Sequence, residues 1–153
     1  MEKELIDYYK KKCFNYRILT LQEKMHIKLL IENIYINQNK RYGFSLFDVL
    51  KIEESVSVNC FSSWSWICDF IKDKNIIVFF DYKEGEYIEL SNGSIFVEFY
   101  EDSPKEEFYI IDLHGTFLLG YNHSNCLFAM GTAADWLEQS EKYMDFYKNK
   151  NIE

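Results

Sequence analysis

The chain has 153 residues, of which 48% are hydrophobic and 18% aromatic, and it carries a formal net charge of −8 at pH 7. This length and apolar content predict one globular domain, residues 1–153, and exclude a disordered chain. No stretch approaches the roughly 18 apolar residues of a membrane span, and the N-terminus lacks the apolar run of a secretory signal. We therefore expect a cytoplasmic protein that does not associate with membranes.

The first half of the chain is predicted to be helical. Thr20 and Glu23 match the capping-box pattern of a helix start, and apolar residues at helical spacing follow them, so a helix is expected over about 21–37. A shorter helix is expected over about 2–11. Ser45 matches the start of a brief third helix, and Ser62 or Ser63 the start of a fourth.

After residue 75 the pattern becomes that of strands. The continuous apolar run 76–80 predicts a central strand covered on both faces. Alternation predicts one strand around Tyr87 and another over 94–102, and Asn92-Gly93 is typical of a tight hairpin between them. Three more strands are expected over 107–113, 116–121 and 126–130, followed by a closing helix.

The closing helix is expected to begin at Thr132 and to pack on the sheet through Trp136. The predicted fold class is therefore α+β. It has N-terminal helices, an antiparallel sheet of about six strands and a C-terminal helix packed on the sheet.

Acidic residues gather in one part of the chain. Ten carboxylates and two lysines lie between Asp81 and Asp112, so this segment carries a net charge of −8 and the rest is neutral. In a strand over 94–102, acids would alternate with aromatics on the outward face. Such a surface attracts a basic protein and can anchor it, although a merely solvated face is the plainer alternative. The expected partner-binding residues are Tyr87, Glu89, Phe96, Glu98, Tyr100, Glu101 and Asp102.

An alternative site is formed by residues of the later predicted turns, namely Asp112, His114, Asn122 and His123. Asp112, His114, His123 and Cys126 are of types that bind zinc, but the short ligand spacings are missing, so no metal is expected. Cys126 and His123 lack an orienting third group and an oxyanion motif, so no catalytic residue is expected. Asn122 and His123 also suit backbone hydrogen bonding in a turn.

Other classes of ligand receive no support from the sequence. No glycine-rich loop precedes a helix, so no nucleotide cofactor is expected. A pI near 4.9 disfavours nucleic acid as a partner. The four cysteines, at positions 13, 60, 68 and 126, have no short paired spacing, and we expect free, reduced thiols.

Four runs in the second half of the chain carry a resemblance: Glu107-Phe-Tyr-Ile-Ile-Asp112, Phe117-Leu-Leu-Gly-Tyr-Asn-His123, Ala129-Met-Gly131 and Ala134-Asp-Trp-Leu137. Over roughly Trp64 to Leu137, the chain resembles small uncharacterised bacterial proteins similar to immunity proteins of polymorphic and contact-dependent growth inhibition toxin systems. Ser124 stands where many of these proteins have a second histidine. The resemblance implies an intracellular antidote rather than an enzyme, and it assigns no toxin-contacting residue.

Resemblance and charge suggest the same function. Nucleases need positive clefts to hold phosphates, so clustered carboxylates can occupy such a cleft. We therefore expect an immunity protein that neutralises a basic toxin domain, with a nuclease as the expected toxin. The alternatives are a small-molecule-binding or enzymatic domain that uses His114, Asn122 and His123, and a housekeeping interaction module.

Overall fold

The computed structural model describes residues 1–152 of the chain, and the side chains of residues 1–149. In chain order the helices and strands are α1 (Glu2–Lys11), β1 (Tyr16–Ile18), α2 (Leu21–Ile34), the 310 helices η1 (Leu46–Val49) and η2 (Ile52–Glu54), β2 (Val56–Asn59), the 310 helix η3 (Ser63–Ile67), α3 (Cys68–Ile71), β3 (Ile76–Phe79), β4 (Ile88–Leu90), α4 (Gly93–Glu101), β5 (Phe108–Ile111), β6 (Phe117–Tyr121), β7 (Cys126–Gly131), α5 (Thr132–Gln139) and α6 (Glu141–Ile152). The protein is α+β, as the sequence predicts.

The strands form one sheet in the order β1-β4-β3-β5-β6-β7-β2, and every neighbouring pair is antiparallel. Short turns connect β5, β6 and β7, which lie side by side. The two strands from the first half of the chain, β1 and β2, form the opposite edges. Neither was predicted from the sequence.

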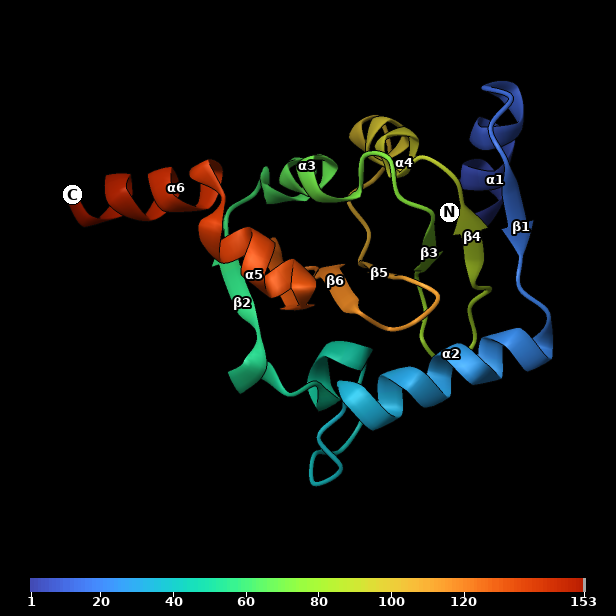
Figure 1. The fold of residues 1–153 in the computed structure, drawn as a ribbon, viewed down its shortest axis with the longest axis horizontal. Coiled ribbons are helices and arrows are strands. Elements are labelled where there is room, and N and C mark those ends of the chain that lie inside the picture. Colours follow the sequence, from blue (N-terminus) through green and yellow to red (C-terminus); the bar gives the residue numbers. More distant parts are fainter. Residues whose placement is uncertain (153) are drawn as a thin grey trace.

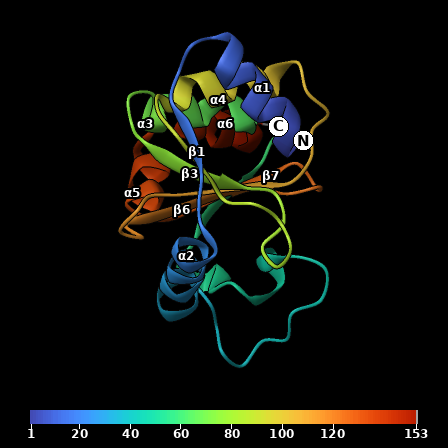
Figure 2. The same cartoon turned by 90° about the vertical axis from the view of Figure 1, so that its right-hand side faces the viewer.

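Helices cover both faces of this sheet (Figures 1 and 2). The helices α1, α3, α4 and α5 pack on one face together with η3, and α2 and η1 pack on the other. Successive side chains of β3 therefore point to opposite faces of the sheet. Val78 is buried in the core under α1, α3, α4 and α5, and Phe79 is buried in the core under α2 and η1. Every residue of β3, β5 and β6 is buried, which explains why these strands are continuous apolar runs.

The capping box predicted for α2 is confirmed. The Thr20 amide donates to a Glu23 carboxylate oxygen at 2.9 Å, and the Glu23 amide donates to the Thr20 hydroxyl at 3.2 Å. The helix buries Ile27 and Ile31 against the sheet. It ends at Ile34, three residues before the expected end.

The strand and hairpin predicted over 92–102 are wrong, because this segment forms helix α4. Its buried residues Phe96, Phe99 and Tyr100 have the i, i+3, i+4 spacing of a helix face. Gly93 serves close packing rather than a hairpin turn. A Cβ atom there would lie 2.4 Å from the carbonyl oxygen of Ile71 in α3.

The closing helix is divided at Ser140 into α5 and α6, and its expected cap is wrong. Thr132 is the first residue of α5, and the capping position belongs to Gly131, which has a positive φ of 66°. Trp136 is half-buried and lies 5.4 Å from the Phe70 ring, measured between ring centres. Among residues 1–152, no helix combines the length and the apolar character needed to cross a membrane.

Candidate protein-binding surface

The outward strand face predicted to bind a partner does not exist. Tyr87, Phe96 and Tyr100 are fully buried. Tyr87 stacks on Phe79 with 4.3 Å between ring centres, and burial raises the pKa of Tyr87. Because 94–102 is a helix rather than a strand, the aromatics point into the core and the acids lie elsewhere on the helix.

The acidic residues of the predicted face are separated by the fold. Glu89 on β4 lies 3.6 Å from Arg17 on β1. Glu98 lies on the exposed side of α4, 3.6 Å from the ammonium of Lys12. Glu101 and Asp102 are exposed at the C-terminal end of α4.

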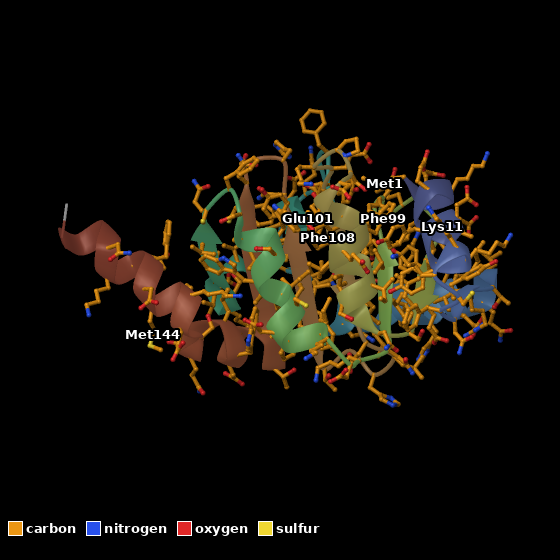
Figure 3. The ribbon with its side chains drawn as sticks, turned by 90° about the horizontal axis from the view of Figure 1, so that it is seen from above. Met1, Lys11, Phe99, Glu101, Phe108 and Met144 are labelled. Atoms are coloured by element: carbon orange, nitrogen blue, oxygen red, sulfur yellow. The ribbon has the colours of Figure 1, made fainter. Side chains whose placement is uncertain are left out.

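The end of α4 borders a surface hollow of about 400 Å³, which we call the acidic hollow. It lies between the start of α1, the end of α4 and the loop that follows, and Figure 3 shows Met1 and Phe99 close together there. Its carboxylates are Glu4, Asp102 and Glu106, and its other lining residues are Met1, Tyr8, Phe99, Ser103 and Pro104. The Tyr8 and Phe99 rings contact each other at 5.6 Å between centres.

Carboxylates lie close to the Tyr8 hydroxyl. Burial raises the pKa of its hydroxyl, and the negative charges of Glu98, Asp102 and Glu101 raise this pKa further. The face of the Tyr8 ring can hold a cation, and Lys12 already lies over it, 5.6 Å from the ring centre. The acidic hollow therefore combines negative charge with an aromatic surface.

Three cations near the acidic hollow already have partners, and the first, Lys12, pairs with Glu98 at 3.6 Å. The N-terminal ammonium of Met1 lies 2.8 Å from the Glu4 carboxylate, which lowers the pKa of Glu4. Lys105 donates to the backbone carbonyls of Tyr100, Glu101 and Ser103 at the end of α4. Asp102 and Glu106 thus line the acidic hollow without a cation of their own among the ion pairs of the described residues.

The start of α1 also contacts an acidic loop. The Glu86 amide donates to a Glu2 carboxylate oxygen at 2.7 Å, which brings the β3–β4 loop to the start of α1. That loop also carries the exposed Asp81 and Glu84. The sequence indicated this concentration of acidic residues. It could not predict the contact between Tyr8 and Phe99, because α1 and α4 are about 90 residues apart in the chain.

The four residues of the alternative site do not come together. Asp112 and His114 follow β5 at one end of the sheet, whereas Asn122 and His123 follow β6 at the other end. The five residues of β6 separate them, a length of about 17 Å in a strand. Cys126 begins β7 beside the second pair, and burial raises the pKa of its thiol, which disfavours the reactive thiolate.

Asn122 has a structural role in its turn. It is buried, and its side-chain oxygen accepts the amides of Ser124 at 2.9 Å and Cys126 at 3.2 Å. The His123 side chain is 80% exposed, and its Nδ1 atom lies 3.5 Å from the Glu107 carboxylate. Sequence reasoning did not include Glu107 because it precedes β5, sixteen residues before His123.

Within the part of the chain that the structure describes, no three histidine, cysteine, aspartate or glutamate residues form a group able to hold a metal ion. The four cysteines are free thiols. The acidic hollow is therefore the best-defined candidate site, and its chemistry suits a cationic side chain. Comparisons of the chain with protein-family models, curated proteins and solved structures find no match.

Proposed function

We propose that this protein is an intracellular immunity protein that binds and neutralises a basic toxin domain through the acidic hollow. The observation that carries the proposal is the combination of an aromatic lining, from Tyr8 and Phe99, with the carboxylates Glu4, Asp102 and Glu106. A solvated acidic surface needs no such lining. A lysine or arginine side chain needs both parts, an apolar surface for its stem and negative charge for its head.

The two parts act on different steps of binding. The clustered carboxylates steer a basic partner toward the hollow and speed its association. Contact with the half-buried Tyr8 ring removes apolar surface from water, which slows dissociation, whereas Phe99 is only 7% exposed and adds little. In a nuclease toxin, the positive cleft that holds nucleic-acid phosphates would be the surface that the carboxylates occupy.

The first experiment identifies the partner. The protein is purified together with the product of the adjacent gene, and the pair is tested for a stable complex and for protection of cells that express the neighbouring protein. We expect a toxin domain with a basic surface. An adjacent product that is not toxic, or that does not bind, contradicts the proposal.

The second experiment locates the contact. Reversing Asp102 and Glu106 to lysine should slow association at least tenfold and weaken its dependence on salt, because the steering field is lost where the partner docks. The matched control reverses Glu54 and Asp73, two exposed acids outside the acidic hollow, with the same change in net charge. Equal effects of the two double variants would show that net charge alone matters.

The aromatic part is tested with Tyr8→Ala. This variant should mainly increase the rate of dissociation, because the long-range field is unchanged. Its folding is checked by circular dichroism and thermal melting. A folded Tyr8→Ala variant that dissociates as slowly as the parent would show that the aromatic lining does not contact the partner.

A further inference from the structure

Strand β1 leaves one edge of the sheet open. The Leu19 amide donates to the Tyr87 carbonyl at 2.9 Å, and the Ser91 amide donates to the Asn15 carbonyl at 3.1 Å. Hydrogen bonds alternate along an antiparallel strand, so odd-numbered residues of this segment face β4. The backbone N–H and C=O groups of Tyr16 and Ile18 therefore point away from the sheet.

The opposite edge is covered at one point. The Ser57 carbonyl of β2 accepts the hydroxyl of Tyr147 from α6 at 3.2 Å. No segment of residues 1–152 pairs with the outer side of β1, which is the end of the strand order. Open strand edges promote pairing with another strand, and proteins usually shield them with charge or a covering element.

Large apolar side chains accompany the open edge. Ile18 on β1 is 44% exposed, and Leu21 and Met25 on the first turns of α2 are 73% and 61% exposed. The helix α2 starts at the same edge of the molecule as β1 (Figure 1). Leu21 and Met25 therefore lie near this edge on the α2 face of the sheet, whereas Ile18 points to the other face, like its cross-strand neighbour Ile88.

We propose that two copies of the chain pair through β1 to form a twofold-symmetric dimer with one continuous sheet. Centring the antiparallel pair on Arg17 places Tyr16 opposite Ile18 of the partner subunit. In this register all four outward-pointing backbone groups of each copy form hydrogen bonds. No other element of the sheet has to move.

The side chains suit this register. Ile18 meets the partner's Tyr16, an aromatic and β-branched pair of the kind that stabilises neighbouring strands. The two Arg17 side chains face each other. Within its own copy, each Arg17 guanidinium lies 2.7 Å from the Glu23 carboxylate and 3.6 Å from the Glu89 carboxylate. Repulsion between the two guanidinium groups is therefore offset.

The size of the contact predicts a modest affinity. A stable specific interface buries about 800 Å² on each partner, roughly a tenth of the 8591 Å² surface of this chain. A three-residue strand with Ile18, Leu21 and Met25 offers less than that. Dimerisation is accordingly expected in the micromolar range, and it does not depend on the toxin-binding function proposed above.

Sedimentation equilibrium of the full chain, without any partner, tests the dimer. Between about 1 and 500 µM the mass should rise from 18.5 kDa toward twice that value. Ile18→Pro removes an amide that faces outward, so it should abolish the dimer and keep the fold. The matched control, Phe44→Ser, removes a 99% exposed apolar side chain from a loop outside the edge and should leave the dimer intact.

Cross-linking tests the register even if Ile18→Pro fails to fold. In the proposed pairing the two residues at position 17 form a non-hydrogen-bonded pair with about 4.5 Å between Cα atoms, which suits a disulfide. In a Cys13→Ser background, Arg17→Cys should form a covalent dimer under mild oxidation, whereas Arg41→Cys should not. A chain that stays monomeric at 500 µM, or a dimer that Arg17→Cys does not cross-link, overturns the proposal.

Discussion

The ammonium of Lys105 donates to the backbone carbonyl of Tyr100 at 2.6 Å and lies 4.9 Å from the centre of the Tyr100 ring. It also donates to the carbonyls of Glu101 and Ser103 and lies 4.7 Å from the Trp64 ring. One cation therefore contacts the last two carbonyls of α4 and one carbonyl of the turn after it, and it offsets their partial negative charge beside the acidic hollow.

Lys105→Met should destabilise the protein by about 1 to 3 kcal/mol, because three carbonyls lose a charged donor while the aliphatic stem is kept. Urea denaturation measures the change. Lys11→Met, at an exposed position on α1, is the control and should change stability by less than about 0.5 kcal/mol. Similar effects of the two variants would mean that Lys105 does not stabilise the end of α4.

Tyr109 holds the carboxylate of Glu107. Its hydroxyl donates to Glu107 Oε2 at 2.8 Å, while Glu107 Oε1 is buried, accepts no hydrogen bond among the described residues and lies 3.5 Å from His123 Nδ1. Tyr109→Phe should therefore cost about 1 to 3 kcal/mol, because it leaves a largely buried carboxylate with even fewer donors.

A double-mutant cycle isolates this interaction. With Glu107→Gln in place, Tyr109→Phe should cost clearly less, because the neutral amide needs less compensation than the carboxylate. Unfolding free energies of the four proteins give the coupling. Strict additivity of the two substitutions would contradict the argument.

Gly93 sets the distance between α3 and α4. In Gly93→Ala the new Cβ would lie 2.4 Å from the Ile71 carbonyl oxygen, so the two helices must separate, at a cost of about 1 to 3 kcal/mol. Gly43→Ala is the surface control: its Cβ would lie 2.9 Å from Asp48 Oδ2, a side-chain atom that accepts the amides of Gly43, Phe44 and Ser45, rather than against the backbone of a packed helix. Thermal melting should lower Tm for the first variant much more than for the second.

The capping carboxylate of α2 makes stability depend on pH in the acid range. Hydrogen bonding to the Arg17 guanidinium, and then to the Thr20 amide, lowers the pKa of Glu23 to about 2 from an ordinary value of 4.5. A lowered pKa in the folded state contributes stability above pH 4.5, and this contribution is lost as the pH falls toward 2.

Glu23→Gln should therefore be less stable than the parent at pH 5 to 7, and the difference should shrink between pH 4.5 and about 2. Urea midpoints across this range provide the measurement. Glu32→Gln, also exposed on α2, serves as the control. A Glu23→Gln difference that stays constant down to pH 2 would rule out the Arg17 interaction as its source.

Elements whose sequence patterns depend on residues close together in the chain were predicted correctly. The Thr20 and Glu23 capping box located the start of α2, and the fully apolar runs located β3, β5 and β6. In each case the residues that decide the structure lie within a few positions of one another. The short edge strands β1 and β2 gave no such signal because their outer sides remain exposed.

The predicted binding site was wrong in a segment whose apolar residues fit both the period of a strand and the period of a helix. From Ile95 to Tyr100 five of the six residues are apolar, so a strand places Ile95, Val97 and Phe99 on one face and a helix places Phe96, Phe99 and Tyr100 on one face. Packing against α1 and α3 decides for the helix. The prediction that the segment is acidic remains correct, but the predicted positions of its aromatic side chains are wrong.

The order of strands in the sheet also constrains how the chain can fold. Its edges, β1 and β2, lie within residues 1–60, and its five central strands lie within 76–131. While the protein is being synthesised, the N-terminal segment has no sheet to join until that later part emerges. Ile27 and Ile31 of α2 stay without their apolar partners on the sheet for the same period. We therefore expect the sheet to assemble from its middle strands outward, through distant contacts that close slowly.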